Sequence, residues 1–400
     1  MDRMVGVTLL GSTGSIGVST LDVVEHHRER FHIVALTANR DAEGMAVQCR
    51  RHRPEYAVMA DPVAASKLRL LLSGLAQPPE VLAGTAALAS VAALPQVDYV
   101  MAAIVGAAGL LPTLAAARAG KRLLLANKEA LVVAGSLMMQ AIADNGAEIL
   151  PIDSEHNAVF QCLPGDFHGG GNIEHLGVER ILLTASGGPF RDTSLEELAA
   201  VTPEAACAHP NWDMGRKISV DSATMMNKGL ELIEACWLFG TDPGRVQILV
   251  HPQSVIHSLV QYRDGSVLAQ LGNPDMRTPI AHALAWPERI VSGVAALDLL
   301  EVRRLDFRPA DPQRFPCLDL AYNAAAQGGT CPVILNAANE VAVDAFLKRR
   351  VGFMDIPAVV DKTLQQLPRE GVEGWEVEQL VDTDHRARRV AEQNLGGVAE

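Results

Sequence analysis

The amino-acid sequence predicts an α/β protein with three parts: a doubly wound parallel sheet at the N-terminus, a central α+β domain and a small C-terminal helical domain. Three observations carry this prediction. Short apolar runs alternate with helical spacing in the first third of the chain, a glycine-rich turn at residues 11–17 follows the first run, and Ala-rich amphipathic segments fill the last third. A chain of 400 residues is also too long for one hydrophobic core.

The composition excludes several classes of function. A net charge of −13 argues against a general nucleic-acid binder, although it leaves room for a local basic pocket that holds a phosphate. The six cysteines form no CxxC pair and no dense framework, which indicates free thiols in a reducing compartment. Cys207 lies close to His209, so a Cys/His nucleophile is an alternative, but no neighbouring residue suggests acyl chemistry.

One uncharged segment, residues 100–117, approaches the roughly 18 residues that a membrane span requires. Gly106, Gly109 and Pro112 interrupt it, so we predict a buried strand that turns into a helix. The first residues run straight into a predicted strand without the pattern of a signal peptide. We therefore expect a cytoplasmic protein that binds no membrane and no nucleic acid.

The first strand, residues 5–10, is an apolar run of the kind buried on both faces of a sheet. Residues 11–17 follow with the spacing GxxGxxG, and residues 19–24 continue with helical spacing. Strand, glycine turn and helix form the context of a Rossmann-like dinucleotide site, because glycine lets the backbone approach a pyrophosphate and the helix N-terminus favours an anion. The usual spacing is GxGxxG, so a tight turn without a ligand remains the alternative.

The second strand, residues 33–36, leads to a candidate cofactor contact. NAD enzymes tend to carry an acid at its end, whereas this chain has Asn39 and Arg40. Arginine there suits the 2′-phosphate of NADP; a solvated surface arginine is the alternative. Asp41 comes next and would repel that phosphate if its side chain pointed inward.

Further strands are predicted at residues 56–59, 99–104 and 123–125, with helical stretches between them, so the sheet is mostly parallel. Residues 127–129, Asn-Lys-Glu, come just after a strand's carboxyl end, where such sheets bind ligands. An ordinary helix start is the alternative interpretation.

The middle of the chain carries a candidate metal site. A strand at residues 148–152 ends at Asp153 and Glu155, whose carboxylates can both reach one cation if the strand breaks into a turn. All-oxygen ligation suits Mg²⁺ or Mn²⁺ better than zinc. A solvated turn is the alternative, since a DxE pattern alone is weak.

A helix is predicted over residues 221–236. Asn227 and Glu231 are four residues apart and share a face, with Lys228 beside them. Ser222 is expected at the helix N-terminus, where its hydroxyl and free N–H groups could hold phosphate. A surface ion pair is the alternative for Lys228.

Two loops complete the candidate site. Residues 184–190 follow a strand at 181–183, and their Ser-Gly-Gly turn can present N–H groups and the Ser186 hydroxyl to an anion. Residues 208–216 mix Pro and Gly with aromatic and charged side chains, so Trp212 and Met214 could close as a lid over a substrate. The alternatives are a plain strand-ending turn and a packed structural loop.

The last third is predicted to be helical. Residues 292–309 read as a connecting stretch, and residues 317–347 and 375–395 as helical segments, with breaks at 328–329, 352 and 374. We expect an NADPH-binding domain over 1–152, a catalytic, metal- and substrate-binding domain over 153–291, a linker over 292–312 and a helical domain over 313–400.

Taken together, these segments resemble one enzyme family over nearly the whole chain, the 1-deoxy-D-xylulose 5-phosphate reductoisomerases. The matching motifs are GSTGSIG from Gly11, LLANKE from Leu124, PIDSEHNA from Pro151, SGGPF from Ser186, HPNWDMGRKISVDSATMMNKGLE from His209 and LNAANE from Leu335. The resemblance implies NADPH and a divalent metal, Mg²⁺ or Mn²⁺ with Co²⁺ as a further alternative, a small phosphorylated sugar as substrate, and a homodimer.

The resemblance also implies roles at matched positions. It implies that Asp153, Glu155 and Glu231 hold the metal and, with His209 and Lys128, form the catalytic set. The implied substrate ligands are Lys128, Ser154, Glu155, Ser186, His209, Ser222, Asn227, Lys228 and Glu231, to which the lid interpretation adds Trp212. The implied NADPH contacts are Thr13, Gly14, Ser15, Ile16, Asn39, Arg40, Asn127, Glu129 and Gly215. Asp41 falls where many family members carry Asn, which puts one hydrogen bond near the adenosine end in doubt.

The implied reaction rearranges the carbon skeleton of 1-deoxy-D-xylulose 5-phosphate beside the metal, a Lewis acid, and then reduces the aldehyde by hydride from NADPH to 2-C-methyl-D-erythritol 4-phosphate. His209, Lys128, water and metal-bound oxygens are candidates for moving the protons. Two alternatives differ in class: another NADP-dependent dehydrogenase without rearrangement, and a nucleotide-binding regulatory module without catalysis. Neither requires the three carboxylates.

Overall fold

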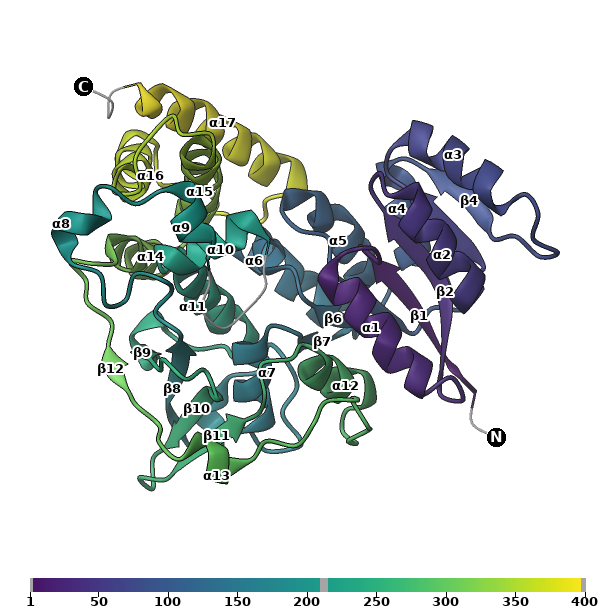
Figure 1. Cartoon of the computed structure of the whole chain (residues 1–400), viewed down its shortest axis with the longest axis horizontal. Helices are drawn as coiled ribbons and strands as arrows, with labels where there is room; N and C mark the ends of the chain where they lie inside the picture. Colours follow the sequence, from purple (N-terminus) through teal and green to yellow (C-terminus); the bar gives the residue numbers. More distant parts are fainter. Residues whose placement is uncertain (1–2, 209–214, 397–400) are drawn as a thin grey trace.

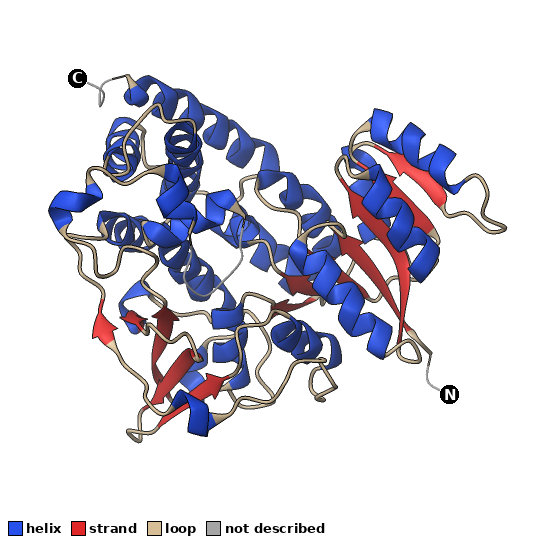
Figure 2. Cartoon of the chain, in the orientation of Figure 1, coloured by secondary structure: helices blue, strands red, loops and turns tan. Residues whose placement is uncertain are grey.

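The computed structural model describes residues 3–208 and 215–396, so His209, Trp212 and Met214 of the predicted lid lie outside the described residues. Figure 1 shows an N-terminal sheet with its helices, a second sheet with its own helices, and a group of C-terminal helices that packs against both. Figure 2 shows the strands gathered in two groups and helices at the C-terminal end, where the described elements from α14 onward are all helices. The predicted fold class is therefore confirmed.

The first sheet has seven strands in the order β4-β3-β2-β1-β5-β6-β7, and every neighbouring pair is parallel. Parallel strands need crossover helices, and the helices that follow them cover both faces of the sheet. The strands are β1 Val5–Leu10, β2 Phe31–Ala38, β3 Tyr56–Met59, β4 Glu80–Ala83, β5 Tyr99–Ala102, β6 Arg122–Leu125 and β7 Glu148–Pro151. The helices are α1 Ser15–His26, α2 Ala42–His52, α3 Pro62–Leu72, α4 Thr85–Ala92, the 3-10 turn η1 Ala107–Gly109, α5 Leu110–Arg118 and α6 Lys128–Asn145.

The order of the strands reverses at β1, which lies between β2 and β5. Open parallel sheets bind ligands at such a reversal, beyond the carboxyl ends of the strands. Five of the six residues of β1 are buried, because the sheet is covered on both faces. The glycine turn after β1 therefore opens at the position where a ligand site is expected.

The second sheet is mixed, with the order β11-β10-β8-β9-β12. Only β8 and β9 are parallel, and the other neighbouring pairs are antiparallel. Its strands are β8 Val178–Ala185, β9 Val246–Val250, β10 Ile256–Tyr262, β11 Val267–Leu271 and β12 Arg308–Pro309. The helices of this part are α7 Ser154–Gln161, η2 Ile173–Leu176, α8 Leu195–Leu198, α9 Pro203–Cys207, α10 Arg216–Ala223, α11 Met226–Leu238, η3 Pro243–Arg245, α12 Arg277–Ala285 and α13 Leu299–Val302.

The C-terminal helices are α14 Pro316–Gln327, α15 Cys331–Leu347, α16 Asp355–Gln366 and α17 Val377–Leu395. Helix α15 is almost entirely buried, since α14, α16 and α17 surround it and it also touches α6 and α10. The predicted break at residues 328–329 is confirmed, because both glycines adopt positive φ angles of 63° and 56°. The C-terminal bundle thus contacts both halves of the chain that frame the cavity described below.

One predicted helix is wrong. Residues 221–236 form no single helix: α10 ends at Ala223 and α11 begins at Met226. Met225 between them has a φ of 60°, a conformation that L-residues seldom adopt, and its side chain is buried in the core. Tertiary packing therefore overrides the continuous helical pattern, and Ser222 lies in the last turn of α10 instead of at a helix N-terminus.

Within the described residues, every helix is too short or too polar to cross a membrane. The uncharged segment at residues 100–117 forms the end of β5, the turn η1 and most of α5, as its glycines and proline predict.

Candidate active site

A cavity of about 750 Å³ lies between the two sheets and is lined from both. The N-terminal part contributes the glycine turn and the start of α6, and the second part contributes the start of α7, the turn after β8, α10 and the first turns of α11. Every predicted substrate and metal residue within the described part of the chain lines this cavity. The topology thus joins segments that are far apart in sequence.

Three carboxylates converge in the cavity. Asp153 follows β7 and caps α7, where its side chain accepts a hydrogen bond from the Glu155 backbone N–H at 3.2 Å. Glu155 lies in the first turn of α7, and Glu231 comes from the second turn of α11. One oxygen from each of the three side chains lies within 4.8 Å of the others. The two carboxylates of the predicted DxE pair therefore lie at the start of a helix. A third carboxylate approaches them from another element.

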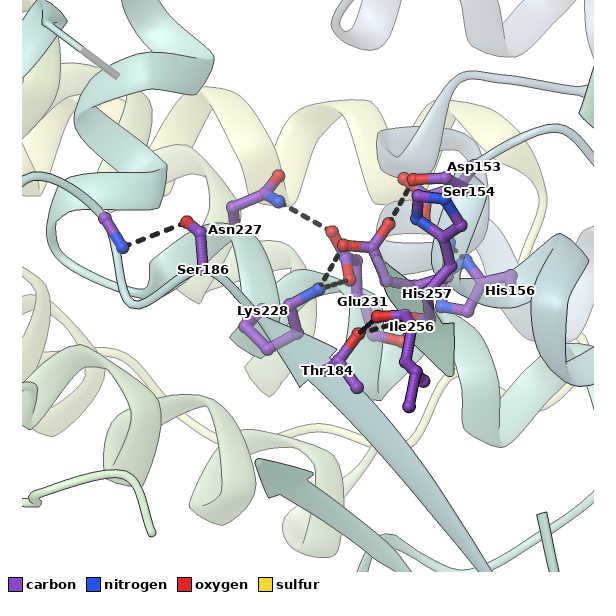
Figure 3. A network of polar contacts seen from close by, with 12 residues as sticks. Asp153, Ser154, His156, Thr184, Ser186, Asn227, Lys228, Glu231, Ile256 and His257 are labelled. Carbon is purple, nitrogen blue, oxygen red and sulfur yellow. Dashed lines mark hydrogen bonds and ion pairs between the residues drawn. The ribbon is translucent and has the colours of Figure 1, made fainter. Parts of the chain in front are cut away.

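Two lysines neutralise part of this cluster. The Lys128 ammonium pairs with Asp153 and lies 3.0 Å from a Glu231 carboxylate oxygen. The Lys228 ammonium lies 2.7 Å from Glu155 and also pairs with Glu231. Asn227, one helical turn before Glu231, donates to Glu231 Oε1 at 2.6 Å, as the predicted shared face requires. Figure 3 shows these α11 side chains gathered at Glu231.

The protonation behaviour follows from burial and charge. Burial and the repulsion of Asp153 and Glu155 raise the pKa of Glu231 above its ordinary value. Burial would lower the pKa of Lys128, but Asp153 and Glu231 hold it well above the ordinary lysine range. Both lysines thus stay charged near neutral pH, and the carboxylates are crowded enough to favour a cation.

The donor set fits a hard divalent cation. All three side chains offer carboxylate oxygens, with no cysteine or histidine among the three, and Mg²⁺ and Mn²⁺ prefer such ligands. Burial and then the repulsion of the other two acids raise the pKa of Glu231, and a bound cation would relieve that repulsion.

A buried histidine packs against the carboxylate cluster, and the sequence analysis did not identify it. His156 Nε2 lies 2.8 Å from the backbone oxygen of Glu231, and His156 Nδ1 lies 3.2 Å from Glu234 Oε2. Burial would lower the pKa of His156, but Glu234 and Asp153 raise it to about 9. His156 immediately follows Glu155 in the PIDSEHNA segment, so its position in the chain was the available signal.

The turn after β8 faces the α10–α11 junction across the same cavity. Ser186 Oγ accepts a hydrogen bond from the Gly188 backbone N–H at 3.1 Å, and Gly187 and Gly188 both have positive φ angles. Ser222, Asn227 and Lys228 line the cavity from α10 and α11. Hydroxyl, amide and ammonium donors therefore surround one end of the cavity, which is the chemistry that binds an anion.

The nucleotide end is formed by the glycine turn and α6. Gly14, Ser15 and Ile16 line the cavity, as do Glu129 and Gly215. Asn127, which also lines it, caps α6 by accepting from the Ala130 N–H at 3.0 Å and donates to the Gly106 carbonyl at 3.0 Å. Asn127 therefore ties the start of α6 to the loop after β5.

Three predicted cofactor residues, Thr13, Asn39 and Arg40, lie outside the lining of this cavity. The Arg40 side chain is 80% exposed, and its Nε lies 3.4 Å from Asp61. Asp41 caps α2 by accepting from the Gly44 N–H at 2.8 Å. The Asp41 carboxylate is therefore engaged with its own helix.

Sequence reasoning also missed His257, the loop residues 274–276 and Lys217, all of which line the cavity. Burial lowers the pKa of His257, so its imidazole is neutral near pH 7. The signal for these residues is weak, because His257 lies within a strand and the loop contains only Pro, Asp and Met.

Comparison with known proteins identifies one family. Models of the 1-deoxy-D-xylulose 5-phosphate reductoisomerase family match residues 7–135 and, for its C-terminal domains, residues 149–239 and 271–390. The chain is 62% identical to 1-deoxy-D-xylulose 5-phosphate reductoisomerase of Cellvibrio japonicus, covering 97% of this chain and 98% of that protein. It is 60% identical to the enzyme of Pseudomonas aeruginosa, covering 99% of each.

Solved structures agree. The reductoisomerase of Zymomonas mobilis in complex with NADPH superposes with a TM-score of 0.91 at 49% identity, covering 99% of both chains. A DOX-P reductoisomerase in complex with NADPH, fosmidomycin and magnesium superposes with a TM-score of 0.91 at 45% identity, covering 98% of both chains.

Proposed function

The chain belongs to the 1-deoxy-D-xylulose 5-phosphate reductoisomerase family, and we propose that the residues of its cavity perform that reaction in the roles given below. The protein is an NADPH- and divalent-metal-dependent enzyme that converts 1-deoxy-D-xylulose 5-phosphate into 2-C-methyl-D-erythritol 4-phosphate, a precursor of isoprenoids. One observation carries the assignment of roles: three carboxylates, two lysines and an anion-binding turn share one cavity with the glycine turn.

Asp153, Glu155 and Glu231 hold the metal. When bound there, a divalent cation polarises a carbonyl oxygen as a Lewis acid. The protein's part is to aim three oxygens at one point from two helices, α7 and α11. His156 steadies this arrangement because it touches the Glu231 backbone and lies 3.7 Å from Asp153.

The anion end of the cavity holds the substrate phosphate through Ser186, Ser222, Asn227 and Lys228. Binding energy from this remote group orients the reacting carbons at the other end. Ser154 and Lys128 face the substrate nearer the carboxylates. Because Lys128 stays protonated, its ammonium donates hydrogen bonds to substrate oxygens. It must give up a proton before it can act as a base.

NADPH lies along the glycine turn, with contacts to Thr13, Gly14, Ser15 and Ile16. Asn127, Glu129 and Gly215 contact it at the mouth of the shared cavity. Asn39 and Arg40 contact the adenosine end, and Arg40 pairs with the 2′-phosphate. The parallel sheet supports this placement, because β1 ends at the reversal of strand order and β2 is its neighbour in the sheet.

His209 and Trp212 lie in the segment 209–214, outside the described residues. We assign them to the substrate: His209 as a polar ligand and second candidate for proton transfer, and Trp212 as apolar cover. Residues on both sides of the segment are positioned for this, since Gly215 lines the cavity and α9 packs against α10.

The active unit is a homodimer located in the cytoplasm. Strand β11 is an edge strand with Val267 and Leu268 about half exposed. Such apolar edges are usually covered. We also retain the division into an NADPH-binding domain at 1–152, a catalytic domain at 153–291, a linker at 292–312 and a helical domain at 313–400.

The test is NADPH oxidation with 1-deoxy-D-xylulose 5-phosphate, followed by the absorbance of NADPH, with and without a chelator, and with mass and NMR analysis of the product. We expect oxidation that requires Mg²⁺ or Mn²⁺ and a product with a branched carbon skeleton. A reduced but unbranched product would indicate a simple dehydrogenase. No oxidation at all with the metal present would refute the proposed function.

A further inference from the structure

The LNAANE segment of α15 contributes nothing to the lining of the cavity, yet one of its side chains reaches the cavity wall indirectly. Asn339 is fully buried, and its Nδ2 donates to Asp221 Oδ1 at 2.8 Å. Asp221 lies on α10 and is itself 1% exposed. The C-terminal bundle therefore holds the residue that immediately precedes Ser222 in the proposed phosphate site.

The other oxygen of Asp221 holds a lysine at the cavity wall. Lys217, one turn earlier on α10, places its Nζ 2.9 Å from Asp221 Oδ2 and 3.4 Å from Glu129 Oε1 on α6. Burial would lower the pKa of Lys217, but Asp221 and Glu129 raise it, so the ammonium stays charged. The contacts thus run from α15 through α10 to the first turn of α6, beside Lys128.

Helix α10 depends on such contacts for its position. It has eight residues, its N-cap Gly215 offers no side-chain cap, and it ends next to Met225 with its positive φ. An isolated helix of this length is unstable in water, so neighbouring elements determine where it lies. Asp221 is its buried anchor, because both carboxylate oxygens have partners on or beyond the helix.

The Asn339 amide orients the Asp221 carboxylate more than it stabilises the fold. Among the described residues its Oδ1 is buried without a hydrogen-bond partner, and an incompletely paired amide adds little net stability. Its Nδ2 nevertheless fixes which Asp221 oxygen faces α15 and leaves the other for Lys217.

We infer that Asn339 is a positioning residue for the substrate: through Asp221 and Lys217 it sets the position of α10 and hence of Ser222. The inference rests on the proposed function, since it assigns Ser222 to the phosphate. A displacement of about 1 Å at a substrate contact can lower turnover efficiency about a hundredfold, so an indirect residue can matter.

The test compares Asn339→Asp with the exchanged pair Asp221→Asn/Asn339→Asp. The single variant sets two carboxylates against each other, and we expect the KM for 1-deoxy-D-xylulose 5-phosphate to rise about tenfold, which corresponds to about 1.4 kcal/mol. The exchanged pair restores an amide–carboxylate contact but moves the negative charge away from Lys217. We expect it to recover part of the melting temperature that the single variant loses, because Lys217 keeps only Glu129 as a charged partner, and to keep the raised KM.

Asn394→Ala is the matched control. Asn394 is a buried amide of α17 that donates to Thr363 Oγ1 at 3.1 Å, far from α10 in the chain of contacts. We expect a lower melting temperature with an unchanged KM. Should Asn339→Asp fail to fold, Asn339→Ala removes the contact without adding charge and should raise the KM about fivefold.

Hydrogen exchange of the amides of residues 216–223 gives a readout that needs no turnover. We expect faster exchange there in the Asn339 variants than in Asn394→Ala. If the Asn339 variants lower only the melting temperature and leave the KM unchanged, the contact merely holds the fold and the inference is wrong. If the exchanged pair recovers the KM, the ion pair between Lys217 and Asp221 is not needed for positioning, and that step of the inference is wrong. If the proposed function is wrong, the wild-type protein will be inactive. Hydrogen exchange of residues 216–223 would still show whether the Asn339 contact holds α10 in position.

Discussion

Replacing Arg40 by alanine should raise the KM for NADPH about two- to hundredfold and leave the KM for NADH nearly unchanged. A hydrogen bond to a charged group contributes about 1.5–3 kcal/mol. To bind the 2′-phosphate, Arg40 must leave Asp61, 3.4 Å away, and an exposed ion pair of this kind contributes about 0.2–1 kcal/mol. The difference is about 0.5–2.8 kcal/mol, and each 1.4 kcal/mol is about tenfold in affinity.

Asp61→Asn tests the competing pair from the other side. Asp61 caps α3 by accepting from the Val63 and Ala64 N–H groups, and asparagine can keep that cap without the charge. Releasing Arg40 should lower the KM for NADPH by up to about fivefold, the factor that 1 kcal/mol gives. The effect should shrink at high ionic strength, since the side chain is mostly exposed.

The assay measures both cofactors at saturating substrate and metal, with Arg69→Ala as control. Arg69 is an exposed arginine of α3 that donates to the Val81 carbonyl at 2.8 Å, so its loss should alter neither KM. Equal changes for NADPH and NADH in Arg40→Ala would show that Arg40 does not contact the 2′-phosphate, and the reasoning from its position after β2 would fail.

Two further predictions concern the metal and the dependence of stability on pH. Glu231→Gln should weaken Mn²⁺ binding at least about a hundredfold, because substituting a residue that only hydrogen-bonds to a metal ligand already lowers metal affinity about 10–100-fold. A wild-type affinity for Mn²⁺ in calorimetry would contradict the proposed metal site. His282→Gln should flatten the acid side of the stability curve: burial, aided by Arg289, lowers the pKa of His282 to about 4, so the unfolded chain takes up a proton below pH 6.5 that the folded protein refuses. The wild type should lose up to about 3 kcal/mol between pH 6.5 and 4 that the variant keeps, measured by urea unfolding at both pH values. Parallel curves for the two proteins would show that His282 titrates normally.

The elements with one dominant signal were predicted well. The strands at 5–10 and 56–59 match β1 and β3 residue for residue, since short apolar runs bounded by turns are buried on both faces of a parallel sheet. Strands β4 and β9–β12 were not predicted. Strands β4, β11 and β12 lie at sheet edges and are at least partly exposed, so burial imposes no clear pattern on them.

The break at Met225 could not be predicted from spacing, because residues on both sides carry helical periodicity. The backbone turns there since Met225 packs into the core and Gly188 of the β8 turn comes close to the end of α10. Both causes are contacts between segments that are distant in sequence. The pairing of Asn339 with Asp221 is of the same kind, since the two residues are 118 positions apart in the chain.

In the site too, features set by neighbouring residues were predicted, and contacts between distant segments were not. A local pattern indicates that Asp153 and Glu155 can share a cation, because they flank the start of one helix. Resemblance to the family added Glu231 as a third metal ligand. The local pattern left an ion pair of Lys228 open as an alternative, but neither source indicated that Lys128 pairs with Asp153 or that Lys228 pairs with Glu155. Those pairings arise because α6 and α11 both reach the start of α7, so they depend on how segments distant in sequence pack together.

The pairings also explain how three acids tolerate one another in a buried cavity. Two ammonium groups balance two of the three carboxylates, which leaves one negative charge and a raised pKa at Glu231. A divalent cation turns that residual charge from minus one to plus one, which suits an anionic substrate. The same two lysines then lose their strongest attraction to the acids and can donate to substrate oxygens. Metal and substrate should therefore favour each other's binding, and by linkage the effect must be equal in both directions.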